Sequence, residues 1–435
     1  MHETRLSPSS RTPRHAVFPL RAWRSIPLAL TLGSVSPAAF SLDVDLAPLD
    51  QSATTFVGTL EGRPLTLELL GQQAVTGGSR VFVRVNDRPI TLRLPAGITL
   101  AEVDGQTPVV LTDGEGKVLL AGRLDALGRD RTLALADELG LLELDQALYG
   151  AQKQALTQNF RPITQRIDAA MAPLGDSPYQ RQPGVSVWST AEIGDLDGDT
   201  RSSDYSGDGK VALLGIDYRS RNLLVGVAAG KSEMYLDGRS GGNTDLGGEM
   251  IAPYVAIALL NDRLVLDATL LYQDLDGSAR RDYLVEGIDL DGDRWGARGA
   301  VTYHLPSYQL TSHRRIDSSL TLGGTYLEDD VDGDYLVGET DYGEETGEVF
   351  AGVRLGADVF TGRLFGGLLY HYDVSSDVDD DADFLEGSDD DRTVLELGAT
   401  QRLGPGVDFT LAGQTTLGSS ATEYDVISAS LSYDF

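Results

Sequence analysis

The chain has 435 residues, of which 23% are charged and 41% are hydrophobic, so it can form two or three folded domains. Its formal net charge of −31 argues against nucleic-acid binding, because phosphate backbones need clustered Lys and Arg. The absence of Cys excludes disulfides, thiolate metal sites and Cys nucleophiles, and it suits a protein that crosses an oxidising periplasm before it assembles.

Residues 1–41 have the features of a secretory signal peptide. Five arginines stand against the single acid Glu3, and a short apolar stretch over 26–35 follows them. Ala39 and Ser41 then supply the small residues that a signal peptidase inspects. We therefore expect export through the Sec translocon, with a disordered cytoplasmic tail as the alternative interpretation.

Residues 42–135 predict a small β-rich domain of six to eight strands. Short apolar or alternating runs, for example 54–60, 80–85 and 117–123, are separated by turn residues such as the Asn-Asp pair at 86–87. The pattern therefore predicts a domain distinct from the longer strands that follow later in the chain.

Residues 136–183 predict a helical linker. Apolar residues recur near helical spacing from Leu139 to Leu156, and Gly and Pro are scarce there. Pro162 is expected to interrupt the helix, with a second helical piece that continues through Met171.

From residue 184 to residue 435 the sequence predicts long antiparallel strands in pairs. The total is twelve, an even number, as bacterial single-chain barrels require. No segment approaches the ~18 consecutive apolar residues of a spanning helix, so a membrane would have to be crossed by strands. The expected strands are 185–195, 209–219, 222–233, 247–259, 262–273, 289–303, 316–328, 344–358, 361–373, 389–402, 405–417 and 421–435.

Three features favour a membrane barrel over a soluble β-sandwich. The connections alternate between tight turns and long polar loops, as in porin-like barrels. Arginines gather at the tight ends, whereas the long loops are acidic, above all 373–391, which has ten Asp or Glu and no base. Of the 17 tyrosines, fifteen lie after residue 184, as an aromatic girdle at the membrane interface would require.

Two stretches resemble a known family. The run from Tyr205 to Tyr218 and the one from Leu223 to Gly230 resemble the first hairpin of autotransporter β-domains, and the resemblance covers about 184–435. The chain end is similar to the C-terminal signal that the β-barrel assembly machinery reads. The resemblance implies type V secretion and a bacterial outer-membrane location. The alternating apolar positions of that assembly signal are Leu431, Tyr433 and Phe435.

The family's mechanism implies a helix in the barrel lumen. Both ends of an even-stranded barrel lie in the periplasm, so a chain that emerges outside must run back through the lumen. Roughly seventeen helical residues cross a ~25 Å band at ~1.5 Å per residue, so 136–172 is long enough. Lys153, Arg161 and Arg166 could then meet lumenal acids. The alternative is a helix that packs on the small β-domain in the periplasm.

The histidines argue against an enzyme. None of the five, His2, His15, His304, His313 and His371, lies in 42–135. Ser-His-Asp chemistry and a His-containing zinc site are therefore excluded there, and we expect no catalytic residue. His371 is expected to be a structural polar residue that faces the lumen or the rim.

Repeated Asp clusters beside the long loops are candidate sites for hard cations. Closely spaced carboxylates suit Ca²⁺ or Mg²⁺, although the fourth-position Gly distinguishes these runs from EF-hand loops. The alternative is a hydrated acidic surface, so we expect no cofactor beyond weak Ca²⁺ or Mg²⁺ binding. The candidate ligands are Asp195, Asp197, Asp199, Asp289, Asp291 and Asp293.

Together these patterns predict an all-β protein, a 12-stranded antiparallel transmembrane β-barrel preceded by an α-helical linker and a small β-rich N-terminal domain. We expect the barrel to translocate or anchor a short passenger at the cell surface. The expected partners are outer-membrane lipid, lipopolysaccharide and the assembly machinery, and the expected state is a monomer. The alternative is a porin- or channel-type barrel whose N-terminal domain stays periplasmic.

Overall fold

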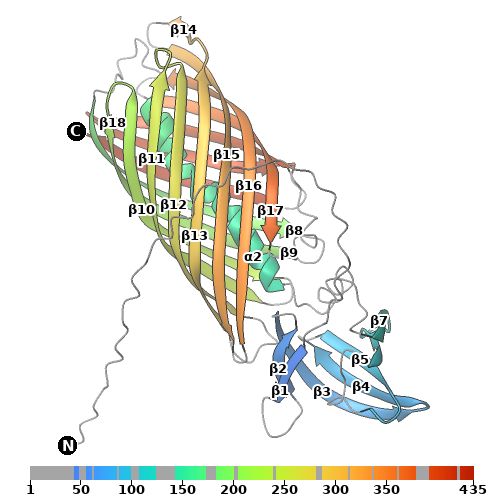
Figure 1. Cartoon of the computed structure of the whole chain (residues 1–435). Helices are drawn as coiled ribbons and strands as arrows, with labels where there is room; N and C mark the ends of the chain where they lie inside the picture. Colours follow the sequence, from blue (N-terminus) through green and yellow to red (C-terminus); the bar gives the residue numbers. More distant parts are fainter. Residues whose placement is uncertain are drawn as a thin grey trace, which may run out of the picture. The chain divides into compact units, whose positions relative to one another are not determined.

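The described residues form two β-sheets and two helices (Figure 1). The predicted signal peptide, 1–41, lies outside the described residues, as do positions 173–182 of the predicted linker. The computed structural model describes residues 44–48, 55–60, 63–85, 88–98, 107–123, 143–172, 183–199, 204–238, 242–280, 287–311, 314–335, 338–359, 362–378, 391–418 and 422–435.

The first sheet is a meander of seven antiparallel strands that are hydrogen-bonded in chain order. Alternation gives the sheet one apolar face, because Val81, Val83 and Val85 of β4 are buried while Phe82 and Arg84 between them are exposed. The predicted small β-rich domain is therefore present. Its strands are β1 (Val44–Pro48), β2 (Thr55–Leu60), β3 (Arg63–Val75), β4 (Gly78–Val85), β5 (Arg88–Pro95), β6 (Pro108–Thr112) and β7 (Val118–Arg123).

The predicted helical segment is also present, as α2 (Glu143–Gln158) and α3 (Arg161–Met171). Pro162 lies in the first turn of α3, where its missing N–H leaves no helical bond unmade. The predicted interruption at this proline is confirmed. Among the described helices, neither is long and apolar enough to cross a bilayer.

Twelve long strands of the second sheet close into an antiparallel barrel around the helical segment (Figure 1). Neighbours in the chain are neighbours in the barrel, and the pairing of β20 with β8 joins the two ends. The predicted fold is confirmed. The strands are β8 (Gly184–Asp199), β9 (Asp204–Arg219), β10 (Leu223–Gly238), β11 (Asn243–Leu259), β12 (Leu264–Arg280), β13 (Ile288–His304), β15 (Arg314–Tyr335), β16 (Gly338–Val359), β17 (Gly362–Val378), β18 (Asp391–Gly404), β19 (Val407–Leu417) and β20 (Thr422–Asp434).

Most of the strands are longer than predicted, and one short strand was not predicted. β15 and β16 have 22 residues each, because their ladder continues through Asp- and Gly-rich runs that read as loops in the sequence. The unpredicted strand β14 (Tyr308–Thr311) pairs with the start of β15. It follows Pro306, which cannot donate to a ladder and so separates β14 from β13.

The connections at 220–222, 260–263 and 405–406 lie at the end that we call the turn end, and we call the opposite end the loop end. The predicted alternation of tight turns and long loops is only partly present, because the longer strands leave two residues between β15 and β16 and four between β10 and β11 at the loop end. Both chain ends of the barrel lie at the turn end, since the Phe435 N–H donates to the Val185 carbonyl at 2.9 Å. Figure 1 shows the C-terminus at the same end as β14.

The outer face of the barrel is apolar over its middle. Leu214, Leu322, Leu355 and Ile427 are each more than 60% exposed there. A soluble sandwich would turn these side chains inward, so the exposed apolar band indicates a wall that faces lipid. On β13 the band is bordered by Trp295 and Tyr303, eight residues apart, or about 26 Å along a strand.

Candidate functional site in the barrel lumen

A bidentate ion pair holds Arg166, the arginine of the helical segment nearest the turn end. Arg166 of α3 donates from Nε and Nη2 to the two carboxylate oxygens of Asp217 at 2.7 and 2.8 Å. Tyr254 also donates to Asp217 at 2.9 Å, and Trp188 donates to the Tyr254 hydroxyl at 2.8 Å. All of these side chains are buried, so the pair is a fully desolvated contact between helix and wall.

A second contact lies at the start of α3. Arg161 Nη1 is 3.4 Å from Glu192 Oε1, and both residues are buried. Neither oxygen of Glu192 accepts a hydrogen bond, so this pair is an ionic contact without hydrogen-bond geometry. Arg161 Nη2 also lies 3.5 Å from the Ser428 hydroxyl, which brings β20 to the same helix position.

A third contact involves α2. Lys153 Nζ is 2.5 Å from Asp373 Oδ2 on β17. Nearby, Glu348 accepts from Arg392 at 2.5 Å and lies 3.1 Å from His371 Nδ1. His371 is therefore a buried polar residue of the lumenal wall, paired with a carboxylate. No hydroxyl nucleophile is hydrogen-bonded to it in the described part of the chain.

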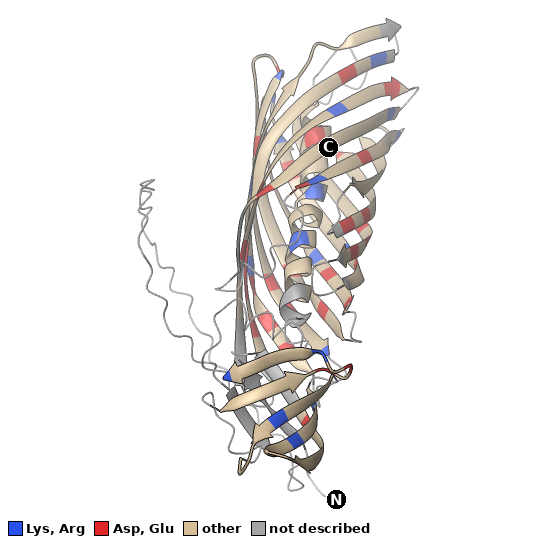
Figure 2. Cartoon of the chain, turned by 90° about the vertical axis from the view of Figure 1, so that its right-hand side faces the viewer, with Lys and Arg blue, Asp and Glu red and all other residues tan. Residues whose placement is uncertain are grey.

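The helix also supplies an acid to the wall. Asp168 forms an ion pair with Arg354, whose Nη2 lies 3.3 Å from Glu396. Gln165 donates to the same Glu396 at 2.9 Å. Figure 2 shows the charged positions of the helical segment inside the ring of strands. The segment is thus bound to the wall at four levels by groups of matched charge.

Small residues let the helix approach the wall closely. A side chain at Gly209 would overlap Gln154 and Gln158 of α2, and one at Gly296 would overlap Phe160. Glycine at these two positions therefore makes room for the helix.

These contacts also fix the direction of the helix. Gly150 abuts the ring of Tyr205, at the loop end of β9, whereas Arg166 reaches Asp217 and Asp434 at the turn end. The N-terminus of α2 consequently points toward the loop end.

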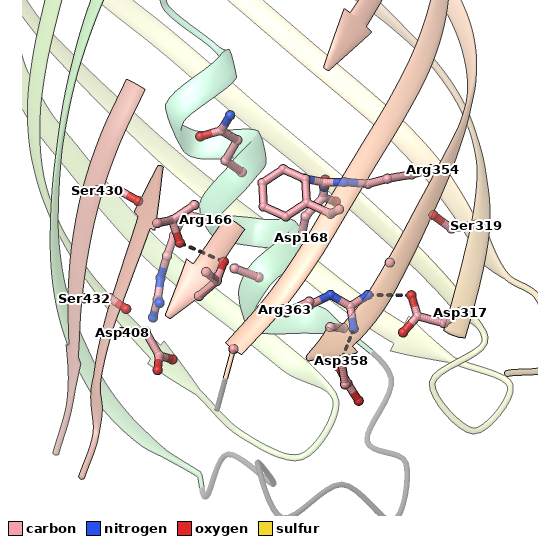
Figure 3. Close-up of a pocket in the computed structure, with 18 of the residues that line it drawn as sticks. Arg166, Asp168, Asp317, Ser319, Arg354, Asp358, Arg363, Asp408, Ser430 and Ser432 are labelled. Atoms are coloured by element: carbon pink, nitrogen blue, oxygen red, sulfur yellow. Dashed lines mark hydrogen bonds and ion pairs between the residues drawn. The ribbon is translucent and has the colours of Figure 1, made fainter. Parts of the chain in front are cut away.

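Two cavities flank α3. One, of about 210 Å³, opens among Arg166, Arg219, Arg315, Arg354 and Arg363 at the turn end. The other, of about 110 Å³, lies beside the end of α2 and the start of α3, among Phe160, Arg298, Glu348 and His371. Acidic residues of the wall form ion pairs with arginines of the first cavity. Figure 3 shows this for Arg363, which pairs with Asp317 and Asp358.

The six predicted cation ligands do not come together. Asp195 and Asp197 are exposed on the outer face of β8, and Asp289, Asp291 and Asp293 are exposed on the outer face of β13. Four other strands separate β8 from β13, and Asp199 ends β8. Within the described ranges, no group of three or more His, Asp or Glu is arranged to hold a metal ion.

The predicted assembly signal lies on the closing strand. Leu431 and Tyr433 point outward from β20, and Phe435 follows its last residue; their exposed fractions are 45%, 44% and 74%. The rings of Tyr433 and Phe435 are 4.7 Å apart in an edge-to-face arrangement.

The comparison with protein families identifies the barrel. The autotransporter beta-domain family matches residues 187–422, which is more than half of the chain. The chain belongs to the autotransporter β-domain family. Such barrels are outer-membrane proteins that the β-barrel assembly machinery inserts, and the exposed apolar band agrees with a location in the outer membrane.

A solved autotransporter structure shares this fold. The translocator domain of autotransporter NalP from Neisseria meningitidis has a TM-score of 0.51 at 14% identity, over 65% of this chain and 98% of that one. The transport unit of AIDA-I from Escherichia coli has a TM-score of 0.46 at 13% identity, over 62% and 97%. No curated protein matches the chain.

The sequence did not reveal the partners of the helical cations in this autotransporter barrel. Asp217, Glu192 and Asp373 are 51, 31 and 220 residues from the cations that they meet. A signal was present for Asp217, which alternates with the outward Tyr218 and so had to face the lumen. The pairing itself depends on the depth of the helix, which alternation does not encode.

Proposed function

We propose that the barrel anchors the chain in the outer membrane and carries the β1–β7 domain to the cell surface, where α2 and α3 remain in the lumen as a plug. The proposal rests mainly on the helical segment in the lumen, whose four levels of charged contact match the wall. A channel would leave its lumen clear for a solute, whereas here the helix occupies it.

Orientation supports export. Both chain ends of an even-stranded bacterial barrel lie in the periplasm, so the turn end, where β8 begins and β20 ends, is the periplasmic end. The N-terminus of α2 points toward the loop end, and the chain that precedes α2 would leave the lumen on the extracellular side. The β1–β7 domain is short for a passenger, so a role in surface contact suits it better than a long fibre.

The remaining parts of the proposal concern biogenesis and chemistry. Residues 1–41 would direct the chain to the Sec translocon and be removed, and Leu431, Tyr433 and Phe435 would signal assembly. Lipid and lipopolysaccharide would surround a monomeric barrel. The protein would act without catalysis and without a resident cofactor, and Ca²⁺ or Mg²⁺ would bind weakly to its acidic outer face.

Protease accessibility of an epitope tag on intact cells tests the proposal. The tag is inserted after Gly114 in the β6–β7 turn, which is exposed. A control tag is inserted after Arg221 in the β9–β10 turn, at the turn end. Heat-dependent gel mobility of the same samples shows whether the barrel is folded. We expect added protease to remove the first tag and to leave the control tag intact.

A tag at Gly114 that is cut only after the outer membrane is permeabilised would place β1–β7 in the periplasm. Export would then be wrong, and a porin- or channel-type barrel with a periplasmic domain would take its place. Cleavage of the control tag on intact cells would instead show that the assumed orientation of the barrel is reversed.

A further inference from the structure

The interior of the barrel changes character from one end to the other. Toward the turn end polar residues such as Asp217, Arg298 and Thr302 line it together with apolar ones such as Leu224 and Val265. Toward the loop end the inward positions are apolar, and most are fully buried. These apolar lumenal residues, which we call the upper core, are Leu196, Met234, Leu236, Leu246, Leu275, Ile288, Leu290 and Val331.

The outer face changes from apolar to acidic at the same height, where the interior becomes apolar. On β13 the outward residues from Tyr303 to Trp295 belong to the lipid-facing band, and the next ones outward are Asp293, Asp291 and Asp289. Adjacent strands carry acids at matching positions in the register. This acidic collar consists of Asp195, Asp197, Asp274, Asp276, Asp289, Asp291, Asp293, Glu328, Asp330 and Asp332.

The switch occurs in one layer of the wall. Trp295 and Tyr272 face outward with their ring centroids 4.6 Å apart, which is typical of an interfacial girdle. The next residue, Arg294, faces inward. Its Nε and Nη2 donate to the two oxygens of Asp329 at 2.7 and 2.6 Å, and its Nη1 lies 3.3 Å from Gln273 Oε1. On the turn-end side of this layer the wall is apolar outside and mixed polar and apolar inside, and on the loop-end side it is largely acidic outside and apolar inside.

The sizes of the residues in the upper core are those of a packed interior rather than a hollow one. Large and small inward residues alternate across hydrogen-bonded neighbours: Leu196 faces Gly207, which faces Leu236. Leu246, Gly277 and Leu290 form a second such row. Alternation of this kind lets side chains interdigitate inside a small barrel, as in the core of a soluble protein.

The start of the helical segment is apolar where the lumen is apolar. The first described turns of α2 carry Ala147, Leu148 and Ala151, which belong to the same buried cluster as the upper core. Polar residues such as Lys153 and Arg166 follow, at the levels where the lumen is polar. Leu148 is 6% exposed and Ala151 is fully buried, so α2 contributes apolar surface to the upper core.

We propose that the loop-end part of the barrel stands outside the bilayer as a water-exposed barrel with a dry apolar core, and that the first half of α2 completes this core and thereby seals the pore. The inference rests on the proposed lumenal plug and adds where the seal lies and what kind of contact makes it. Water and ions are excluded there by apolar packing, and the ion pairs nearer the turn end position the helix.

Single-cysteine labelling on intact cells tests the position and dryness of the upper core. The chain contains no Cys, so each variant reports one position. Asp291→Cys lies on the acidic collar, Leu290→Cys in the upper core, and Leu322→Cys on the lipid-facing band. We expect a sulfonated maleimide to label Asp291→Cys within minutes and to label the other two at least tenfold more slowly until the membranes are heat-denatured.

Slow labelling of Asp291→Cys in the folded barrel would place the collar in lipid and overturn the proposal. Rapid labelling of folded Leu290→Cys would show that the core is wet and would overturn it as well. Heat-dependent gel mobility identifies variants that fail to fold. The tag at Gly114 reports independently on export. A periplasmic tag together with the expected labelling pattern would contradict export and leave the dry core standing.

Conductance in planar lipid bilayers tests the role of α2 in the seal. The double variant Leu148→Gln with Ala151→Gln puts polar groups into the upper core and leaves the wall unchanged. We expect several-fold more current than the native chain carries. Leu70→Gln, at an exposed position of β3, is the matched control and should leave the current as it is. A double variant as closed as the native chain would show that apolar packing of α2 is not the seal.

Discussion

The contact between Arg166 and Asp217 shows how a single pair can position the helical segment. Both oxygens of Asp217 accept from Arg166, and Tyr254 donates to one of them. Such a pair gains little over an apolar pair of similar size, because both charges must be desolvated. Removal of one partner is different, since it leaves a buried charge without compensation.

Arg166→Ala should therefore lower the free energy of unfolding by about 3–5 kcal/mol. The paired replacement Arg166→Met with Asp217→Leu should recover most of that loss, because no uncompensated charge remains. Urea unfolding of the full chain in detergent micelles, followed by Trp fluorescence, measures both. Losses that simply add in the double variant would contradict a directly coupled pair.

At the residue scale, the sequence predicts only the helical partner of each contact and not the acid that it meets. Lys153, Arg161 and Arg166 stand out because few cations occur in a predicted lumenal helix. Their partners are three acids in a chain with 66, and the alternation of a strand says only which of them face inward. The pairing depends on how deep the helix sits, which the packing of Gly209 and Gly296 against α2 and Phe160 determines in three dimensions.

At the scale of elements, all twelve predicted strands are present because their alternation and turn residues are local signals. The ends of the strands were less predictable. The run from Glu328 to Asp334 has the composition of a loop, yet it lies within β15 because neighbouring strands supply hydrogen-bond partners at the same height. Helical period likewise predicted α2 and α3, whereas their burial inside the barrel came from the family resemblance.

The helical segment is the element that closes the lumen, and deletion of residues 143–172 should open it. The wall would keep its inter-strand ladder, so the barrel should still fold and show heat-dependent gel mobility. Large stable currents in planar bilayers are expected for the deletion and small or absent currents for the full chain. Equal currents from the two would show that the segment leaves the lumen in a bilayer, and the plug would have to be abandoned.

At the scale of the whole molecule, the net charge of −31 is distributed unevenly. The acidic collar places like charges directly opposite one another, as in the register pairs of Asp291 with Asp276 and with Asp332. Like charges directly opposite one another destabilise a sheet. The packed upper core beneath the collar offsets this repulsion, so the fold tolerates a surface that favours strong hydration.

Salt should therefore stabilise the folded barrel. The Debye length falls from about 30 Å at 0.01 M to about 10 Å at 0.1 M and about 3 Å at 1 M, which screens the collar. We expect the midpoint of heat unfolding in an uncharged detergent to rise with NaCl. Asp291→Asn with Asp293→Asn should raise the midpoint at low salt and reduce its salt dependence. A midpoint that is flat or falls with NaCl would contradict the repulsion.

The same titration tests the predicted cation sites. CaCl₂ at matched ionic strength screens the collar as NaCl does, so any additional rise in the midpoint measures Ca²⁺ binding to carboxylates. Because four strands separate Asp195 and Asp197 from Asp289, Asp291 and Asp293, binding would occur at separate weak sites. An additional rise that disappears in the Asp291→Asn, Asp293→Asn variant would assign the site to β13. Equal rises with the two salts would leave screening as the whole effect and remove the cation sites from the proposal.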